Sequence, residues 1–190
     1  MAPVIRGTRL VHDGWGRFLI ADIAMPDGSR LAREIEDHGR AVSVLPYDPQ
    51  QRVALLIRQF RAPLFYADGT PDLLEAPAGL LDEPDPEEGV RREAYEETGV
   101  RLSRLELVSR VWSMPGISTE RMDLFLGAYA QADRVGEGGG LADEGEDITV
   151  CEMPLSELAA MSDRGEITDI KTLTLLLALR LRRPDLFSVR

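Results

Sequence analysis

The sequence predicts an α/β protein, because strand-type runs are interleaved along the chain with well-marked helices. Apolar runs typical of β-strands recur through most of the 190 residues, and turn residues separate several of them. Capping residues and helical spacing mark one helix near the middle of the chain and another near its end. No internal repeat is visible, so most of the chain is expected to form one domain.

The first 38 residues are expected to form a separate antiparallel β-region. Phe18 to Met25 is a β-type run, Pro26-Asp27-Gly28 is a turn signal, and Leu31 to Ile35 fits the return strand of a hairpin. A two-stranded hairpin is only marginally stable by itself in water, so this one is expected to pair with the main domain or with a second copy of the chain. Residues 39–190 are the predicted main domain.

The main domain is expected to combine five strands with helices at its centre and its end. The predicted strands are residues 41–46, 53–59, 105–112, 122–129 and 148–153. A short helix is expected from Leu155 to Ser162. A final helix, capped by Asp169 or Thr168, is expected to run through Arg182. Helical spacing predicts that one side of this last helix is buried, namely Leu173, Leu176, Leu177 and Leu181.

Composition and charge argue against several classes of function. The net charge is −11 at pH 7 and the pI is about 4.7, whereas a nucleic-acid surface needs a basic patch. The most apolar run, Leu173 to Leu179, is too short to span a bilayer. Cys151 is the only cysteine, so no internal disulfide can form and nothing indicates an oxidising compartment. With no secretory signal visible, a cytoplasmic location is expected, without nucleic-acid or membrane partners.

The central helix is marked at both of its ends. Asp85 is a suitable N-cap, Pro86 fits the first helical position, and Glu88 completes a capping-box spacing. Gly99 is a natural stop just past the last turn. The sequence therefore predicts a helix that begins at residue 86 and ends just before residue 99.

Three glutamates gather on this helix. Glu93 and Glu97 are one turn apart on the same face, and Glu96 lies beside them. Like charges at this spacing destabilise a helix by roughly 0.2–0.5 kcal/mol per pair. A divalent cation such as Mg²⁺ reverses this effect, because it takes carboxylate oxygens together with substrate phosphates. For an isolated pair, the alternative is the solvated acidic face of a surface helix.

The pair is not isolated, because the stretch from Gly79 to Val100 resembles the Nudix box. That motif is Gly, five residues, Glu, seven residues, Arg-Glu, an apolar residue, any residue, Glu-Glu, any residue, Gly and an apolar residue. The matching positions are Gly79, Arg92, Glu93, Ala94, Glu96, Glu97, Gly99 and Val100. The interval from Gly79 to Arg92 is one residue shorter than in the motif, so its first glutamate has two candidate counterparts, Glu83 and Asp85.

Beyond the box, most of the chain resembles the ADP-ribose and nucleoside-diphosphate-sugar pyrophosphatase branch of the Nudix hydrolases, and above all its GDP-mannose pyrophosphatases. The similarity includes residues 75–82, 115–116, 138–148 and 170–173. It implies an α/β/α sandwich around a mixed sheet, in a homodimer whose N-terminal β-region reaches over the neighbour's active site. It also implies Mg²⁺-dependent hydrolysis, with Mn²⁺ as an alternative ion, of a nucleotide sugar to a nucleoside monophosphate and a sugar phosphate.

The same resemblance implies roles for individual residues. Metal would be held by Glu93, Glu97, Glu146 and the backbone carbonyl of Ala78. Glu144 would act as the general base, with Glu120 as the alternate base. Substrate would be contacted by Arg61, Glu120, Lys171, Ala78, Gly79 and Leu80 and, from the partner subunit, by Trp15, Arg33 and Glu34.

Several of these residues also have explanations that need no ligand. Trp15, in a glycine-flanked loop, can cap the edge of a core instead of stacking on a base. Arg61 can be a solvated strand-end arginine instead of a phosphate clamp. Lys171 is poorly placed for the helix dipole, so it is either a surface lysine or bound to a phosphate or an acidic partner. The acidic run 143–147 can be solvated instead of completing a metal site.

Three rival functions stay open from the sequence alone. The substrate can be ADP-ribose instead of GDP-mannose, because the base pocket is expected to lie in loops and in the N-terminal region. The chain can be a Nudix-derived module that binds nucleotides without catalysis, a possibility that the shortened box favours. A purely structural acidic domain is the third, but it would leave the cluster of carboxylates unexplained.

Overall fold

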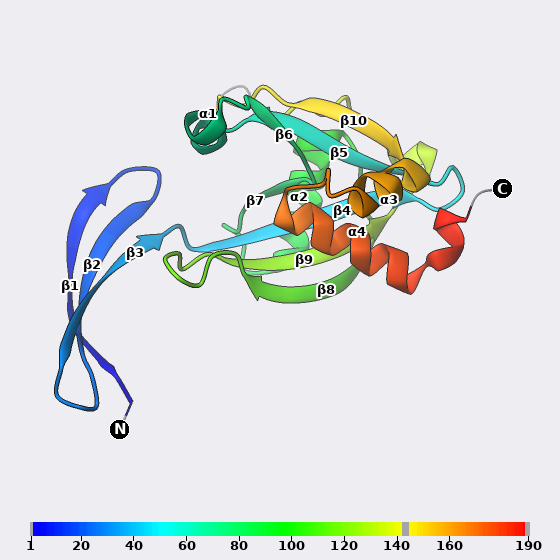
Figure 1. Ribbon diagram of the computed structural model, residues 1–190. Helices are drawn as coiled ribbons and strands as arrows, with labels where there is room; N and C mark the ends of the chain where they lie inside the picture. The colour runs from blue at the N-terminus through cyan, green and yellow to red at the C-terminus, as the bar shows by residue number, and fades with distance from the viewer. Residues whose placement is uncertain (1, 142–144, 189–190) are drawn as a thin grey trace. The chain divides into compact units, whose positions relative to one another are not determined.

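The computed structural model describes residues 2–141 and 145–188. The chain folds into two compact units. The first unit contains residues 1–41 and 111–122, and the second contains residues 42–110 and 123–190. Figure 1 shows the order of the elements along the chain.

The first unit is built on a three-stranded antiparallel sheet in the order β1-β2-β3. Its strands are β1 (Val4–Asp13), β2 (Arg17–Ala24) and β3 (Arg30–Asp37) (Figure 1). Strands β2 and β3 confirm the predicted hairpin, and they pair from Arg17 opposite Asp37 to Ala24 opposite Arg30.

Strand β1 is absent from the sequence-based prediction. Its register with β2 shifts twice, between Ile5 and Gly7 and between Leu10 and His12. Each such irregularity disturbs the two-residue alternation of side chains, and all ten residues of β1 are exposed. The apolar residues of β1 accordingly fall in adjacent pairs, Val4-Ile5 and Leu10-Val11, and no strand periodicity is visible in the sequence.

Residues 111–122 complete the first unit by bonding to the end of β3. The amide of Glu36 donates to the carbonyl of Ile117 at 2.9 Å, and the amide of Thr119 donates to the carbonyl of Glu36 at 2.8 Å. The Thr119 hydroxyl also donates to the carboxylate of Asp37 at 2.6 Å. The loop with the predicted Pro115-Gly116 turn is therefore part of the β-region, although it is distant in sequence.

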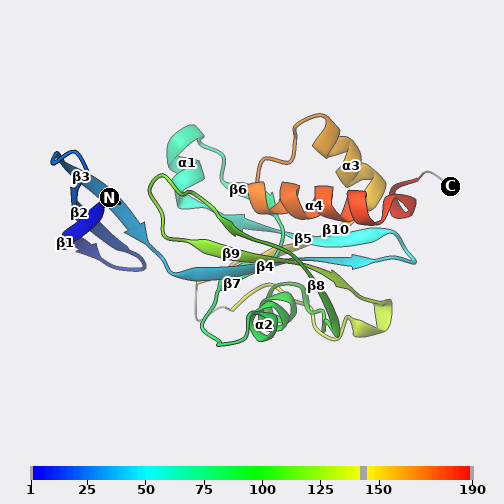
Figure 2. The ribbon, with the colours of Figure 1, turned by 90° about the horizontal axis from the view of Figure 1, so that it is seen from below.

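The second unit is an α/β/α sandwich around a seven-stranded sheet. The sheet has the path β10-β5-β4-β9-β8, with β6 paired to β5 and β7 paired to β4. Figure 2 shows helix α2 on one face of this sheet and helices α3 and α4 on the other. The predicted fold class, an α/β/α sandwich around a mixed sheet with an N-terminal antiparallel β-region, is confirmed. The strands are β4 (Arg40–Asp48), β5 (Val53–Phe60), β6 (Asp72–Glu75), β7 (Ala78–Leu80), β8 (Arg104–Trp112), β9 (Arg121–Ala128) and β10 (Thr149–Pro154), and the helices are α2 (Pro86–Thr98), α3 (Leu155–Asp163) and α4 (Ile170–Arg182).

The five strands predicted for the main domain lie within two residues of β4, β5, β8, β9 and β10. The short strands β6 and β7 and the helix α1 (Ala62–Asp68) are not predicted. Helix α1 has no buried residue, so it has no apolar face for the sequence pattern to reveal. Two short 3₁₀ helices, η1 (Gln131–Asp133) and η3 (Pro184–Phe187), follow β9 and α4.

Helix α2 has the predicted ends. The carboxylate of Asp85 accepts from the amide of Glu87 at 3.0 Å, where the predicted capping box would have used Glu88. Gly99 adopts a φ of 72° and donates to the carbonyl of Tyr95, a conformation that favours glycine. The apolar face of α2 packs on the sheet through a buried cluster made of Val42, Val44, Leu55, Val90, Ala94, Val100, Leu102, Phe125 and Tyr129.

The buried side of α4 differs from the prediction. Leu175, Leu176 and Leu179 are buried, whereas Leu177 is 41% exposed and Leu181 is 83% exposed. Because the run from residue 173 to 179 is apolar on almost every side of the helix, the sequence alone does not determine which side faces the sheet. Within the described ranges, no helix is long and apolar enough to cross a membrane.

Candidate functional site

Strand β7 and helix α2 bring two predicted metal ligands together. The carboxylate of Glu93 lies directly over Gly79, because a Cβ built on that glycine would come within 1.9 Å of Glu93 Oε1. The amide of Ala78 donates to Glu97 Oε2 at 3.0 Å. Only glycine at residue 79 allows the helix and its glutamate to approach the strand so closely. The box therefore orients both carboxylates over β7.

Both carboxylates are buried, with Glu93 8% exposed and Glu97 1% exposed. Burial raises the pKa of Glu97 to about 8, and the charge of Glu93 acts in the same direction. Burial also raises the pKa of Glu93 to about 7, although the charge of Arg92 opposes the shift. Ionised carboxylates in such a place need a cation, since burial of uncompensated charge is costly.

Glu146 adds a third acidic group near this pair. Its charge raises the pKa of both Glu93 and Glu97. Its Oε2 atom accepts a hydrogen bond from the amide of Leu141 at 3.0 Å. Glu144, the predicted general base, lies outside the described residues.

The donor set fits a hard divalent cation. Among the described residues, no three His, Cys, Asp or Glu side chains already converge closely enough to hold a metal. The two buried carboxylates, with Glu146 in their electrostatic field, nevertheless supply oxygen ligands and unbalanced negative charge, which Mg²⁺ prefers to nitrogen or sulfur. The role of the Ala78 carbonyl stays a prediction, because the observed contact of Ala78 with the pair is through its amide.

Arg92 holds the other acidic groups of the box in place. Its guanidinium donates to Glu83 at 2.6 Å and to Glu96 at 2.9 Å, and it lies 2.8 Å from Glu93 Oε1. It also donates to the carbonyl of Leu80 at 3.2 Å. Mainly through the hydrogen bond from Arg92, the pKa of Glu83 is held below its usual value. Glu96 is therefore bound by Arg92, although its charge also raises the pKa of Glu93.

A buried glutamate anchors the two predicted substrate-binding cations. Glu75 accepts from Arg61 Nε at 2.7 Å and from Arg61 Nη2 at 3.0 Å, and it also accepts from Lys171 Nζ. Lys171 is 9% exposed and lies 3.1 Å from Asp169, so the prediction of an acidic partner is confirmed and the surface-lysine alternative is wrong. Arg61 is likewise bound to a carboxylate and is not a freely solvated strand end.

The cations and the carboxylates of the box belong to one electrostatic site. The charge of Arg61 lowers the pKa of Glu97, and the charge of Glu97 raises the pKa of Arg61. A structural link also joins helix α4 to the start of β7, because the hydroxyl of Thr172 accepts from the amide of Ala76 at 2.6 Å. The site thus contains fixed positive charges beside a pair of carboxylates that needs a cation.

The remaining predicted residues lie in the first unit. Trp15 is 80% exposed, and its ring centroid is 4.6 Å from that of His38, so it does not cap the edge of a core. Glu120 is partly buried, and its amide donates to the Ser118 hydroxyl at 3.1 Å. Arg33 and Glu34 line a cavity of about 390 Å³ between β3 and the loop that follows β8.

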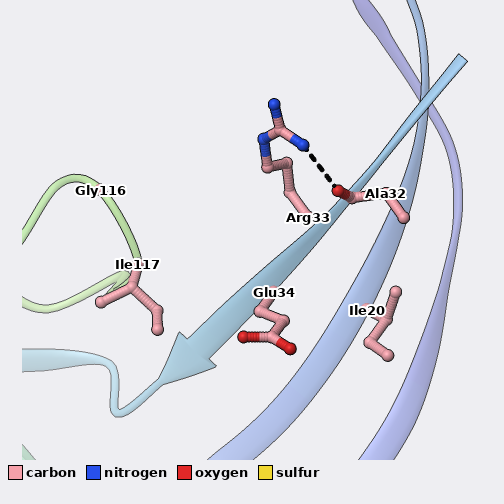
Figure 3. A pocket seen from close by; sticks show the side chains of 6 residues that line it. All are labelled: Ile20, Ala32, Arg33, Glu34, Gly116 and Ile117. Atoms are coloured by element: carbon pink, nitrogen blue, oxygen red, sulfur yellow. Dashed lines mark hydrogen bonds between the residues drawn. The ribbon is translucent and has the colours of Figure 1, made fainter.

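Figure 3 shows this cavity of the first unit from close by. Ile20 on β2 and Glu34 on β3 are register partners, and Ile117 faces them from the loop. The guanidinium of Arg33 donates to the carbonyl of Ala32 at 2.9 Å. The cavity therefore combines an arginine, a carboxylate and apolar side chains, which suits a polar ligand with a flat or apolar part.

Comparison with known sequences identifies the family. A profile of the NUDIX domain matches residues 37–176, which is most of the chain. The chain belongs to the NUDIX family. Two similar proteins are named GDP-mannose pyrophosphatase: that of Cronobacter sakazakii is 43% identical over 170 residues, 87% of each chain, and that of Pectobacterium atrosepticum is 40% identical over 176 residues, 88% of this chain and 89% of its own.

The fold of this NUDIX chain is also found among solved structures. A crystal structure of an ADP compounds hydrolase superposes with a TM-score of 0.78 over 97% of this chain and 96% of that chain. The two sequences are 19% identical, so the likeness concerns the fold.

The structure distinguishes the two candidates for the first glutamate of the shortened NUDIX box. Glu83 bonds to Arg92, the arginine of the box, whereas Asp85 caps helix α2. The glutamate that the sequence-based site omits is Glu75. It precedes the box in the stretch of family resemblance, and this is the only signal that could have identified it, because its partners Arg61 and Lys171 are distant in sequence.

Proposed function

We propose that this chain hydrolyses the pyrophosphate bond of a nucleoside-diphosphate sugar, with GDP-mannose as the favoured substrate and Mg²⁺ as the metal. As a NUDIX protein with relatives named GDP-mannose pyrophosphatase, the chain is a hydrolase that acts on pyrophosphate bonds. The products of the proposed reaction are GMP and mannose 1-phosphate.

One observation carries the proposal: the buried pair Glu93 and Glu97 beside an arginine that is already fixed by another carboxylate. Once ionised and without metal, the pair attracts cations and repels anions. Arg61, held by both oxygens of Glu75, presents its outer face for phosphate oxygens. A pyrophosphate with its divalent cations matches both halves of this site.

In the proposed mechanism, acidic residues bind the metal and basic residues bind the phosphates. Bound Mg²⁺ would supply neutralisation of the pyrophosphate oxygens and polarisation of the nucleophile. Glu93, Glu97 and Glu146 would hold the ions, while Arg61 and Lys171 would orient the phosphates. Glu144 is the proposed proton acceptor and Glu120 the alternate one, and a base of this kind typically contributes about 10²–10⁴-fold.

The preference for GDP-mannose rests on the similar proteins of that name, which align over most of their length with this chain. The similarity to the ADP compounds hydrolase is one of fold. The cavity beside Arg33 and Glu34 is the proposed place of the nucleotide of the partner subunit, together with Trp15.

The experiment that tests this function compares two substrates. Release of phosphate monoester from GDP-mannose and from ADP-ribose is measured with and without Mg²⁺, using a coupled phosphatase. Mg²⁺-dependent turnover of GDP-mannose above that of ADP-ribose is expected. Preference for ADP-ribose would contradict the proposed substrate, and tight nucleotide binding without turnover would support a NUDIX module without catalysis.

A further inference from the structure

A second polar cavity, of about 490 Å³, opens in the second unit. It lies where the ends of β4, β9 and α4 meet the first half of α2 and the start of β8. None of the residues that line it takes part in the carboxylate site or in its cation network. The proposed hydrolysis therefore gives this cavity no role.

Arginines dominate the charge of the cavity. Arg91, Arg104 and Arg183 line it, against two carboxylates, those of Glu87 and Glu106. A concentration of guanidinium groups is unexpected on a chain whose net charge is −11. Guanidinium groups that converge on a cavity favour carboxylate or phosphate ligands, because their donors form a planar fork.

The arginines are oriented but not saturated. Arg91 donates to Glu87 at 2.9 Å and to the carbonyl of Leu102 at 3.0 Å. Glu106 is shared between Arg183, at 3.1 Å, and Arg182, at 2.8 Å. Since a guanidinium has five N–H donors, each of these side chains keeps donors for a further acceptor.

Arg104 is the cation of the cavity that lacks an internal partner. It is exposed at the start of β8, and its guanidinium makes no hydrogen bond or ion pair with any residue that the structure describes. The cavity therefore contains more positive charge than its own carboxylates balance.

The phenol of Tyr47 adds a neutral hydrogen-bond donor to the cavity. Tyr47 is 6% exposed and lines the cavity. Its hydroxyl has no hydrogen-bond partner within residues 2–141 and 145–188. Burial raises the pKa of this phenol, while the charge of Arg183 opposes that shift, so the hydroxyl stays a neutral donor beside a cation. Unlike the hydroxyl of Tyr129, this hydroxyl is not sealed from solvent, so it can donate to an acceptor in the cavity.

We propose that this cavity binds a phosphate group, either free or on a small phosphorylated metabolite, through Arg91, Arg104 and Arg183 and a hydrogen bond donated by Tyr47. The site is distinct from the carboxylate pair and does not depend on metal. A phosphorylated compound bound there contacts α2 at Arg91, the helix that also carries the box.

Calorimetric titration of the metal-free full chain tests this proposal. In EDTA and at low ionic strength, metal-assisted binding at the carboxylate site is removed, and the variants below assign the remaining binding of inorganic phosphate to the arginine cavity or to Arg61. Saturable binding to the wild-type chain is expected. A second titration with mannose 1-phosphate distinguishes the sources, because tighter binding of the ester identifies a phosphorylated metabolite and equal binding identifies the phosphate group alone.

Two variants and one matched control locate the binding. Arg104→Glu is expected to weaken phosphate binding at least about tenfold, since a charge-assisted bond is replaced by a repulsion. Tyr47→Phe is expected to weaken it by about threefold to tenfold without loss of thermal stability, because the hydroxyl has no internal partner to lose. Arg101→Glu makes the same change of charge three residues away, outside the cavity, and is expected to bind as the wild type does.

Three results would overturn the proposal. They are an absence of phosphate binding to the wild-type chain, binding unchanged in both Arg104→Glu and Tyr47→Phe, or the same loss in Arg101→Glu as in Arg104→Glu. The last result would mean that overall charge, and not the cavity, determines the binding. Tyr47→Phe keeps the test decisive if the charge reversal disturbs the fold.

Discussion

Glu75 is the single residue on which the cationic part of the site depends. It is 3% exposed, and burial alone would raise its pKa, but the bonds and charges of Arg61 and Lys171 outweigh burial and hold the pKa below its usual value. Its partners lie 14 and 96 residues away in sequence. Sequence spacing cannot predict such a pairing, which exists only because β6, α1 and α4 are brought together by the fold.

Glu75→Gln is expected to weaken substrate binding and catalysis together. An amide cannot accept from Arg61 with two charged oxygens, so kcat/KM should fall about 10–100-fold, mainly through misplacement of the guanidinium. The buried Lys171 would keep only Asp169 as a charged partner, at a cost of about 1–3 kcal/mol in the free energy of unfolding. Steady-state kinetics and thermal unfolding measure the two effects.

The control for this substitution is Glu152→Gln. Glu152 forms a surface ion pair with Arg134, side-chain exposures 40% and 29%, and such pairs contribute about 0–1 kcal/mol. Equal effects of the two substitutions on kcat/KM would contradict the positioning role of Glu75.

The carboxylate pair predicts a characteristic pH dependence for the metal-free chain. Glu93 and Glu97 titrate near 4.5 when unfolded, but burial raises their folded pKa values to about 7 and about 8. Below pH 4.5 both carboxyl groups are protonated in the folded and in the unfolded chain, so the free energy of unfolding does not change. As the pH rises from 4.5 through 8, the unfolded chain releases its protons first, so the folded state loses stability.

Urea unfolding in EDTA across this pH range measures the loss, and added Mg²⁺ should offset it most at the alkaline end, where protons no longer compete. The double variant Glu93→Gln with Glu97→Gln should flatten the profile in EDTA. An unchanged profile in that variant would show that other groups cause the dependence.

At the scale of elements, strand β7 and helix α2 pack in direct contact, because the carboxylate of Glu93 lies against Gly79. The helix itself is predictable from sequence, since its caps and charges are local signals. The short strand β7 beneath it is not predictable, because three residues are too few to show the alternation of side chains that marks a strand. The buried side of α4 is predicted wrongly for the opposite reason: apolar residues lie on almost every side of this helix, so the pattern does not single out one face.

Gly79→Ala tests this close approach. The new methyl group would overlap the Glu93 carboxylate and displace it, so Mg²⁺ affinity should fall about 10–100-fold while the thermal unfolding temperature changes little. Gly7→Ala is the matched control, because no atom lies within 4 Å of a Cβ at that strand position. Calorimetric titration with Mg²⁺ measures both, and a similar affinity for the two variants would count against the arrangement.

At the scale of the whole molecule, the exposed strand β1 bears on assembly. Its apolar residues Val4, Ile5, Leu10 and Val11 are each about half exposed. An exposed apolar edge strand commonly pairs with another chain. The proposed homodimer would cover this surface, and it would supply Trp15, Arg33 and Glu34 to the neighbouring site. The sequence showed only the hairpin of this unit, since the irregular register of β1 hides its period.

Val11→Asp is expected to shift the chain from dimer to monomer, since a buried charge at an apolar interface is costly. Leu181→Asp is the control, because Leu181 is 83% exposed on α4, outside the β-region. Sedimentation velocity at several concentrations distinguishes the two species. A monomeric wild-type chain, or a dimer unaffected by Val11→Asp, would contradict the proposed assembly.

Mg²⁺-dependent hydrolysis of GDP-mannose by Glu97→Gln, measured beside Glu88→Gln, tests the role of the buried pair most directly. Glu88 is exposed on the same helix, so its variant should keep wild-type activity. Glu97→Gln is expected to lose at least about 10²-fold in kcat while its fold and its unfolding temperature in EDTA are retained. Full activity of Glu97→Gln in Mg²⁺ would contradict the assignment of the buried pair to the metal and, with it, the proposed mechanism.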